Sequence, residues 1–176
     1  SLVSQMYRNA LKLLDMINQM LDFSKYEAGK MQLRLKLTDL AELAGDTVAI
    51  FREVVDRKGV KLHFIREEET PPAYLDEDKI ERILTNLVRN AIKFTDRGSI
   101  TVRVGKRSET LYLEVRDTGI GIPASHLPDI FKRFQQVDGS STRKYEGTGL
   151  GLTIVKESAD LMHGTVSVES EQGRGT

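Results

Sequence analysis

From residue 31 onward, segments whose apolar side chains recur at every second position alternate with segments whose apolar side chains recur every three to four positions. The first pattern is typical of half-buried strands and the second of amphipathic helices. Such alternation predicts an α/β fold in which a layer of helices covers a mixed sheet. The strands are expected at 31–37, 60–66, 99–104, 111–116 and 165–169, and the helices between 39 and 59 and at 76–94, 127–134 and 149–162.

The first 27 residues differ from the rest, because their pattern predicts a single long helix over 2–27. An isolated helix cannot bury a continuous apolar stripe on itself, so it needs a second helix, a second chain or both. We therefore expect homodimerisation through this region. Gly29 marks the predicted break, which divides the chain into 1–29 and 30–176. The stripe has a heptad seam of Val3, Met6, Ala10, Leu13, Ile17 and Met20, widened by Leu11, Leu14 and Leu21.

The composition excludes several classes of protein. Lys+Arg and Asp+Glu both total 26, and no dense basic block occurs, which argues against a nucleic-acid-binding protein. The absence of cysteine excludes disulfides and cysteine-based zinc sites. No apolar run reaches the roughly 18 residues that a membrane span requires. The sequence thus predicts a soluble, cytoplasmic segment without direct membrane contact, whose parent protein could be anchored in the inner or plasma membrane.

A polar face is predicted on the helix 76–94. Asn86, Asn90 and Lys93 fall within about 60° of one another around the helix axis. An amide oxygen suits Mg²⁺ that is also held by phosphates and water, and a lysine one turn away can neutralise phosphate charge. Taken alone, the same pattern also fits an ordinary solvated helix face.

Two glycine-rich turns follow. Asp117, Gly119 and Gly121 come directly after an apolar strand, where an acid can accept a hydrogen bond from an exocyclic amine such as that of adenine. Gly147, Gly149 and Gly151 enter a helix, where bare backbone amides favour a phosphate. Each turn alone also fits a structure without a ligand.

The segment between the two turns contains Phe131 and Phe134 and then a polar loop with Arg143 and Lys144. Such a loop can close over a nucleotide, and its two basic residues could reach phosphates. The alternative is that both phenylalanines belong to the core and that the loop is plain surface.

In this order, the four segments resemble the N box, first glycine box, F box and second glycine box of sensor histidine kinases. The resemblance covers residues 31–176, and residues 13–30 are similar to the family's second dimerisation helix with its exit into the ATP-binding domain. It implies the two-layer α/β sandwich (the Bergerat, or GHKL, fold) that the family shares with gyrase-, Hsp90- and MutL-type ATPases, here preceded by one long helix.

The resemblance also implies roles for individual residues. Asn90 is expected to ligate Mg²⁺, and Asn90 and Lys93 are expected to act in catalysis. The remaining nucleotide-site residues are expected to contact phosphate (Asn86, Lys93, Arg143, Lys144), to bind adenine and shape its pocket (Asp117, Gly119, Gly121), to anchor the lid (Phe131, Phe134), to form its hinge and phosphate-facing end (Gly147, Gly149, Gly151), or to line the site beside these groups (Phe94, Ile122, Thr148, Leu150).

The implied activity is transfer of the γ-phosphate of Mg-ATP to a histidine, for onward transfer to an aspartate of a response-regulator receiver domain. No histidine of the chain lies in the family's acceptor motif, so the acceptor helix is expected to be absent from this fragment, which then cannot autophosphorylate alone. The chain also stops at Thr176, where the family usually adds one more strand, and such a loss would lower stability.

Two other functions stay open. A hydrolytic ATPase of the chaperone, topoisomerase or mismatch-repair type carries a glutamate base four residues before its Mg²⁺-binding asparagine. That position is Asn86 here, which cannot take up a proton at neutral pH, and this favours the kinase. The remaining alternative is a non-catalytic nucleotide-binding or dimerisation module.

Overall fold

The computed structural model describes residues 6–7, 9–10, 13–14, 17, 21, 32–67, 70–132 and 149–176. The chain divides into two compact units, Ser1–Gln32 and Leu33–Thr176. In the first unit, all eight described residues before position 22 have helical backbone, and seam residues such as Leu13 and Ile17 are exposed. Most of the predicted N-terminal helix lies outside the described residues. No helix among the described residues has the length and apolar character needed to cross a membrane.

The second unit contains a three-stranded mixed sheet. Its strands are β2 (Val60–Arg66), β4 (Gly98–Arg107) and β5 (Thr110–Asp117), in the order β2-β4-β5. β2 runs parallel to β4, and β4 runs antiparallel to β5. The predicted alternation is borne out in β4, where Ile100, Val102 and Val104 are fully buried on one face, whereas most residues of β5 are half-buried without alternation.

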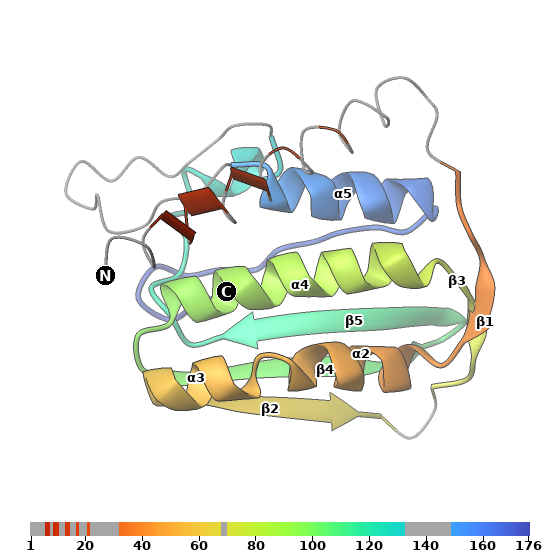
Figure 1. The fold of residues 1–176 in the computed structure, drawn as a ribbon, viewed down its shortest axis with the longest axis horizontal. Coiled ribbons are helices and arrows are strands. Elements are labelled where there is room, and N and C mark those ends of the chain that lie inside the picture. Colours follow the sequence, from red (N-terminus) through yellow and green to blue (C-terminus); the bar gives the residue numbers. More distant parts are fainter. Residues whose placement is uncertain are drawn as a thin grey trace. The chain divides into compact units, whose positions relative to one another are not determined.

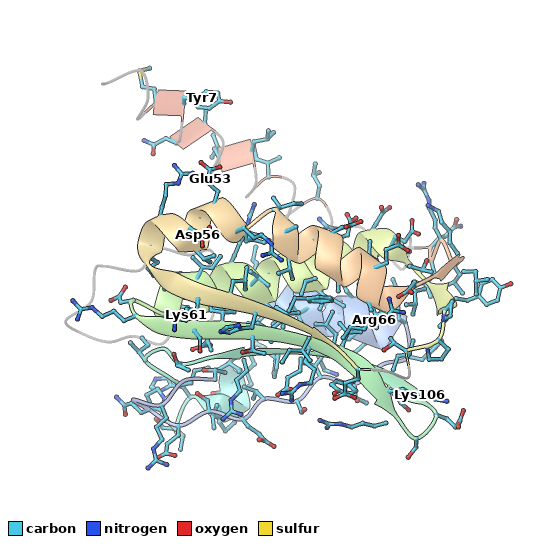
Figure 2. The ribbon with its side chains drawn as sticks, turned by 90° about the horizontal axis from the view of Figure 1, so that it is seen from below. Tyr7, Glu53, Asp56, Lys61, Arg66 and Lys106 are labelled. Carbon is cyan, nitrogen blue, oxygen red and sulfur yellow. The ribbon has the colours of Figure 1, made fainter. Side chains whose placement is uncertain are left out.

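A layer of helices covers that face of the sheet. Figure 1 shows α4 (Glu77–Phe94) between α2 (Leu40–Ala49) and α5 (Gly151–Leu161), and α4 packs against both of them. In Figure 2, α2 and α3 (Arg52–Lys58) lie on one side of the strands β2 and β4. The arrangement is the helix layer on a mixed sheet that the sequence predicts.

The core lies between α4 and the sheet. The apolar residues of α4 recur every three to four positions, and Leu84 and Val88 are completely buried against Val102 and Val104. Burial of one such side chain stabilises the fold by about 1.5–3 kcal/mol. Because this face of α4 is fixed by the core, its polar face is directed elsewhere.

The expected helix between residues 39 and 59 is two helices, α2 and α3. Asp39 does begin it, accepting hydrogen bonds from the amides of Ala41 (2.9 Å) and Glu42 (3.1 Å). Gly59, in the left-handed region at φ +73°, ends α3. Between the two helices, the amide of Phe51 bonds to the carbonyl of Val48 three residues back (3.0 Å), and this tighter turn interrupts the α-helix.

Two expected strands are shorter or missing. The strand expected at 31–37 is reduced, among its described residues, to β1 (Lys36–Thr38), which pairs with the three residues of β3 (Ala73–Leu75), an element that the sequence pattern did not indicate. Residues 165–169 do not form a strand. Instead, the backbone amide of Asp117 in β5 donates to the carbonyl of Thr176 at 2.8 Å. An alternating sequence predicts which side chains are exposed, but a strand also needs a neighbouring strand to pair with.

The last two helices also differ from their expected bounds. The helix expected at 127–134 is a 3₁₀ turn, Leu127–Asp129, with Pro128 in its first positions, and residue 134 lies outside the described residues. The helix expected at 149–162 begins two residues later, at Gly151, because Gly149 has a left-handed φ of +70°.

Candidate functional site

Helix α4 is the element that positions most of the candidate site. Asp76 caps it by accepting from the amide of Lys79 at 3.1 Å, and Glu77 and Asp78 favour its first turn through the helix dipole. The helix ends at Thr95, which is extended at φ −109° and ψ 103°. Along the polar face, Asn86 lies near the middle of the helix, and Lys93 lies in its last turn.

Asn86 lies against the first residue of α5. A Cβ atom added to Gly151 would be 3.0 Å from the Asn86 Oδ1 atom. The Asn86 amide nitrogen donates to the carbonyl of Arg82 at 2.9 Å, so its oxygen is the atom that faces α5. Leu150, which precedes α5, has an aliphatic side chain that cannot cap the amides of the first turn. An N-terminus of this kind attracts anions.

Asn90 lies one helical turn beyond Asn86. It is half-buried, and its side-chain amide has no hydrogen-bond partner among the described residues. An amide in that state can turn its oxygen toward a cation or its NH₂ group toward an anion.

Lys93 is a half-buried cation without a carboxylate partner among the described residues. Its ammonium lies 4.6 Å from the centre of the Phe94 ring. Burial lowers the pKa of Lys93 below its usual value, because no opposite charge compensates for the lost hydration. A phosphate at this position would supply the missing charge.

Asp117, the last residue of β5, directs its carboxylate at the end of α4. Its Oδ1 atom accepts from the amide of Gly119 at 2.7 Å and from the hydroxyl of Thr95 at 3.5 Å. Burial raises the pKa of Asp117, and these hydrogen bonds to the charged form oppose the rise. The backbone of Thr176 also hydrogen-bonds to this carboxylate, and no side chain among the described residues is bonded to the Oδ2 atom.

The glycine turn after Asp117 packs closely against the backbone of Phe94 and Glu171. A Cβ atom on Gly119 would come within 2.3 Å of the carbonyl oxygen of Phe94, the same oxygen that accepts from the amide of Ile120 at 3.1 Å. Gly121 has φ +64°, and a Cβ atom there would be 2.1 Å from the carbonyl oxygen of Glu171. Both positions require glycine because no side chain fits.

The remaining predicted residues are placed only in part. Ile122 is half-buried, and its amide donates to the hydroxyl of Ser170 at 2.8 Å. The carbonyl of Phe131 accepts from the hydroxyl of Thr153 in α5 at 3.2 Å, which links the predicted F box to this helix. The following predicted residues lie outside the described residues: Phe134, Arg143, Lys144, Gly147 and Thr148.

Two residues at the end of α4 were not singled out from the sequence. Thr95 is fully buried and donates to Asp117. The ammonium of Lys58, the last residue of α3, bonds to the carbonyl of Ile92 at 2.5 Å and lies 3.4 Å from Asp96. For Thr95 the signal was its place directly after the polar helix segment, whereas nothing in the sequence relates Lys58 to a residue so far along the chain.

The described residues of the candidate site are therefore arranged along helix α4. The middle of α4 touches the N-terminus of α5 through Asn86, and its C-terminal end touches the glycine turn through Thr95 and Phe94. Asn90 and Lys93 lie between these two contacts on the same helix face. A cation, an amide without a partner among the described residues, an anion-attracting helix end and a half-buried carboxylate are thus arranged along one helix.

Residues 75–176 match the sequence model of the family described as histidine kinase-, DNA gyrase B-, and HSP90-like ATPase. The chain belongs to this family, and curated proteins similar to it are histidine kinases. It is 41% identical over 175 residues to an uncharacterised sensor-like histidine kinase of Rhizobium meliloti, covering 99% of this chain and 33% of that protein. It is 40% identical over 169 residues to hybrid signal transduction histidine kinase D of Dictyostelium discoideum, covering 93% of this chain and 11% of that protein.

Among solved structures, full-length ShkA in complex with AMPPNP superimposes with a TM-score of 0.84 at 29% identity, over 93% of this chain and 34% of that one. The similarity confirms the α/β sandwich of this family as the fold. The chain spans a third or less of the curated relatives named above.

Proposed function

We propose that the chain binds Mg-ATP along the polar face of α4 and acts as the catalytic domain of a sensor histidine kinase. The observation that carries the proposal is the contact of this one helix with both the Asp117 turn and the N-terminus of α5. In this arrangement, the Asp117 carboxylate accepts from the exocyclic amine of adenine. Lys93 and the amides at the start of α5 then meet the phosphates. The AMPPNP complex of the similar ShkA structure supports a nucleotide of this type.

Magnesium fits the residues that are present. No group of three or more His, Cys, Asp or Glu side chains that could hold a metal occurs among the described residues. The donor suited to Mg²⁺ is instead the amide oxygen of Asn90, which is not engaged by any described residue. Mg²⁺ usually keeps several waters and is shared with substrate phosphates, so one protein oxygen is sufficient. When bound, the ion would neutralise charge that develops on the phosphates.

The proposed reaction moves the γ-phosphoryl group to a histidine nitrogen: the bond to the oxygen bridging the β- and γ-phosphorus atoms breaks, and a phosphorus–nitrogen bond forms. In this family of reactions, catalysis consists mainly of positioning and charge stabilisation. No histidine in the 176-residue sequence lies in an acceptor motif, and we propose that the acceptor lies on a separate dimerisation helix. The phosphoryl group would pass from it to a receiver-domain aspartate.

One residue favours the kinase over a hydrolytic ATPase. Hydrolysis requires a base to activate water, and the residue one turn before Asn90 is an asparagine. The amide nitrogen of Asn86 is moreover bonded to its own helix. We propose that the absence of a carboxylate at this position protects bound ATP from water until the histidine arrives.

The proposal is tested by calorimetric titration of the chain with ATP, with and without Mg²⁺, followed by incubation with radiolabelled ATP and a separately supplied acceptor hairpin. We expect Mg²⁺-dependent binding and label on the hairpin histidine. Asn90→Ala should remove the Mg²⁺ dependence, and Asp117→Asn should weaken binding. Exposed Arg57→Ala, on α3, is the matched control. Unchanged affinity in both site variants would refute the assignment, and release of free phosphate without labelled hairpin would favour the hydrolase.

A further inference from the structure

Thr95 occupies an unusual position for a polar side chain. It is fully buried, at 0% exposure, and it is the first residue beyond α4. Its backbone amide is already satisfied by the carbonyl of Ala91 at 3.0 Å. A buried hydroxyl requires a partner, and its partner among the described residues is the Asp117 Oδ1 atom at 3.5 Å.

The hydroxyl therefore acts on the same oxygen as the amide of Gly119, which is 2.7 Å from Oδ1. The end of α4 and the glycine turn thus each direct a donor at Oδ1, the backbone of Thr176 gives the carboxylate a further hydrogen bond, and no side chain among the described residues is bonded to Oδ2. Rotation of the carboxylate would break the short bond to Gly119 and the longer one to Thr95. The carboxylate therefore presents its second oxygen in one direction.

We propose that Thr95 is a positioning residue for base recognition: its hydroxyl holds the Asp117 carboxylate so that Oδ2 accepts from the exocyclic amine of adenine. This inference rests on the proposed function. It goes beyond that function by assigning the selection of an amino-purine to the pair Thr95–Asp117 rather than to Asp117 alone. Thr95 does not itself touch the base.

The test compares Thr95→Val and Thr95→Ser in the intact chain. Valine keeps the β-branched shape and suits the extended backbone at this position, so the fold should tolerate it, whereas serine keeps the hydroxyl. Affinities are measured for Mg-ATP and for the Mg complex of purine riboside triphosphate, which lacks the exocyclic amine. A merely structural role would change both affinities together, whereas a positioning role changes their ratio.

We expect the wild-type chain to prefer ATP by about tenfold, which corresponds to one hydrogen bond to a charged group. Thr95→Val should bind ATP roughly threefold to tenfold more weakly, with little change for the analogue, so that the preference largely disappears. Thr95→Ser should restore it. The pH below which ATP binding falls should also move upward in Thr95→Val, because the carboxylate loses a donor that favours its charged form.

Thr47→Val is the matched control. Thr47 is also buried, at 5% exposure, but its hydroxyl donates to the carbonyl of Leu43 within α2 at 2.8 Å. It should keep the wild-type ratio of affinities. Thr95→Ala is measured in parallel and gives the same comparison with serine if the valine variant does not fold.

The measured affinities distinguish base recognition by Asp117 from the positioning role of Thr95. A wild-type chain that binds both nucleotides equally would refute base recognition by Asp117, and with it the proposed function of this turn. A wild-type chain that prefers ATP, together with hydroxyl-free variants that keep the full preference, would overturn the role of Thr95 alone.

Discussion

The carboxyl group of Asp117 illustrates how a binding residue can oppose the stability of its own fold. Burial raises the pKa of Asp117, so the folded chain holds the proton of this carboxyl group more tightly than the unfolded chain does. Stability contributed by such a group is present at low pH and is lost as the pH rises through the interval between the ordinary and the raised pKa. At neutral pH, the charged form is therefore kept at a cost in stability.

Asp117→Asn should consequently separate stability from binding. The amide oxygen of asparagine can still accept from the amide of Gly119, but no charge is buried. We expect a higher melting temperature for the nucleotide-free variant at neutral pH, together with weaker ATP binding. Thermal denaturation at several pH values checks this. A variant that melts below the wild-type chain at neutral pH would contradict it.

The same carboxyl group predicts the acid limit of binding. Protonation of the carboxyl group would weaken its acceptance from the adenine amine through Oδ2, and the raised pKa of Asp117 means that protonation begins at a higher pH than for an ordinary aspartate. We therefore expect ATP affinity to decline on acidification before exposed carboxyl groups titrate. Calorimetric affinities across the acidic range measure this decline. Loss of affinity only near the usual pKa of aspartate would argue against the buried carboxylate as ligand.

Gly119→Ala tests the close approach of the turn to α4. A methyl group there would lie 2.3 Å from the Phe94 carbonyl oxygen, so the turn must move and Asp117 with it. We expect ATP binding to fall by at least tenfold. Gly59→Ala is the control: its left-handed backbone costs alanine about 1–2 kcal/mol, but no atom lies within 4 Å of the added carbon. It should lower the free energy of unfolding while ATP affinity stays unchanged.

At the scale of elements, α4 is fixed at both ends by hydrogen bonds to other parts of the chain. At its start, the buried carboxylate of Asp76 accepts from the amide of Lys79 at 3.1 Å and also from the amide of Arg34 at 2.8 Å. At its end, the ammonium of Lys58 satisfies the carbonyl of Ile92. These contacts set the position of the helix along its own axis, and hence the place of Asn90 within the site.

Asp76→Ala should be among the more destabilising polar substitutions. It removes a helix cap and leaves the Arg34 amide without its partner, for an expected loss of about 2–3 kcal/mol. Asp78→Ala, in the same first turn but exposed, should cost only about 0.3–1 kcal/mol through the helix dipole. Urea unfolding of the two variants measures the difference. Equal losses would show that the contact with Arg34 contributes nothing.

The elements also show what the sequence could predict and why. Periodicity was sufficient for β2 and α4, because their apolar faces are set by the core alone. It failed at 165–169, where a strand depends on a partner rather than on pattern. The order of the boxes indicated most of the described residues of the candidate site. Thr95 was missed because its contact with Asp117 joins residues that only the fold brings together.

At the scale of the whole molecule, the two compact units are expected to behave differently in solution. Apolar residues of Ser1–Gln32 such as Leu13 and Ile17 are exposed at 59% and 47%. We propose that this unit associates with a second copy. Sedimentation should show that the mass of the intact chain rises with concentration, whereas a chain shortened to 33–176 remains a monomer and still binds ATP. A shortened chain that self-associates as strongly as the intact one would place the interface elsewhere.

The hydrogen bonds between the N-terminal end of α4 and residues 34–38 have a further consequence. Glu77 accepts from the ammonium of Lys36 (2.7 Å) and the hydroxyl of Thr38 (3.1 Å), directly beside the bond from Arg34 to Asp76. Hence the segment from Arg34 to Thr38, at the start of the second unit, is bonded at three positions to the N-terminal end of α4. We therefore expect a displacement of the backbone at Arg34 to shift the first turn of that helix.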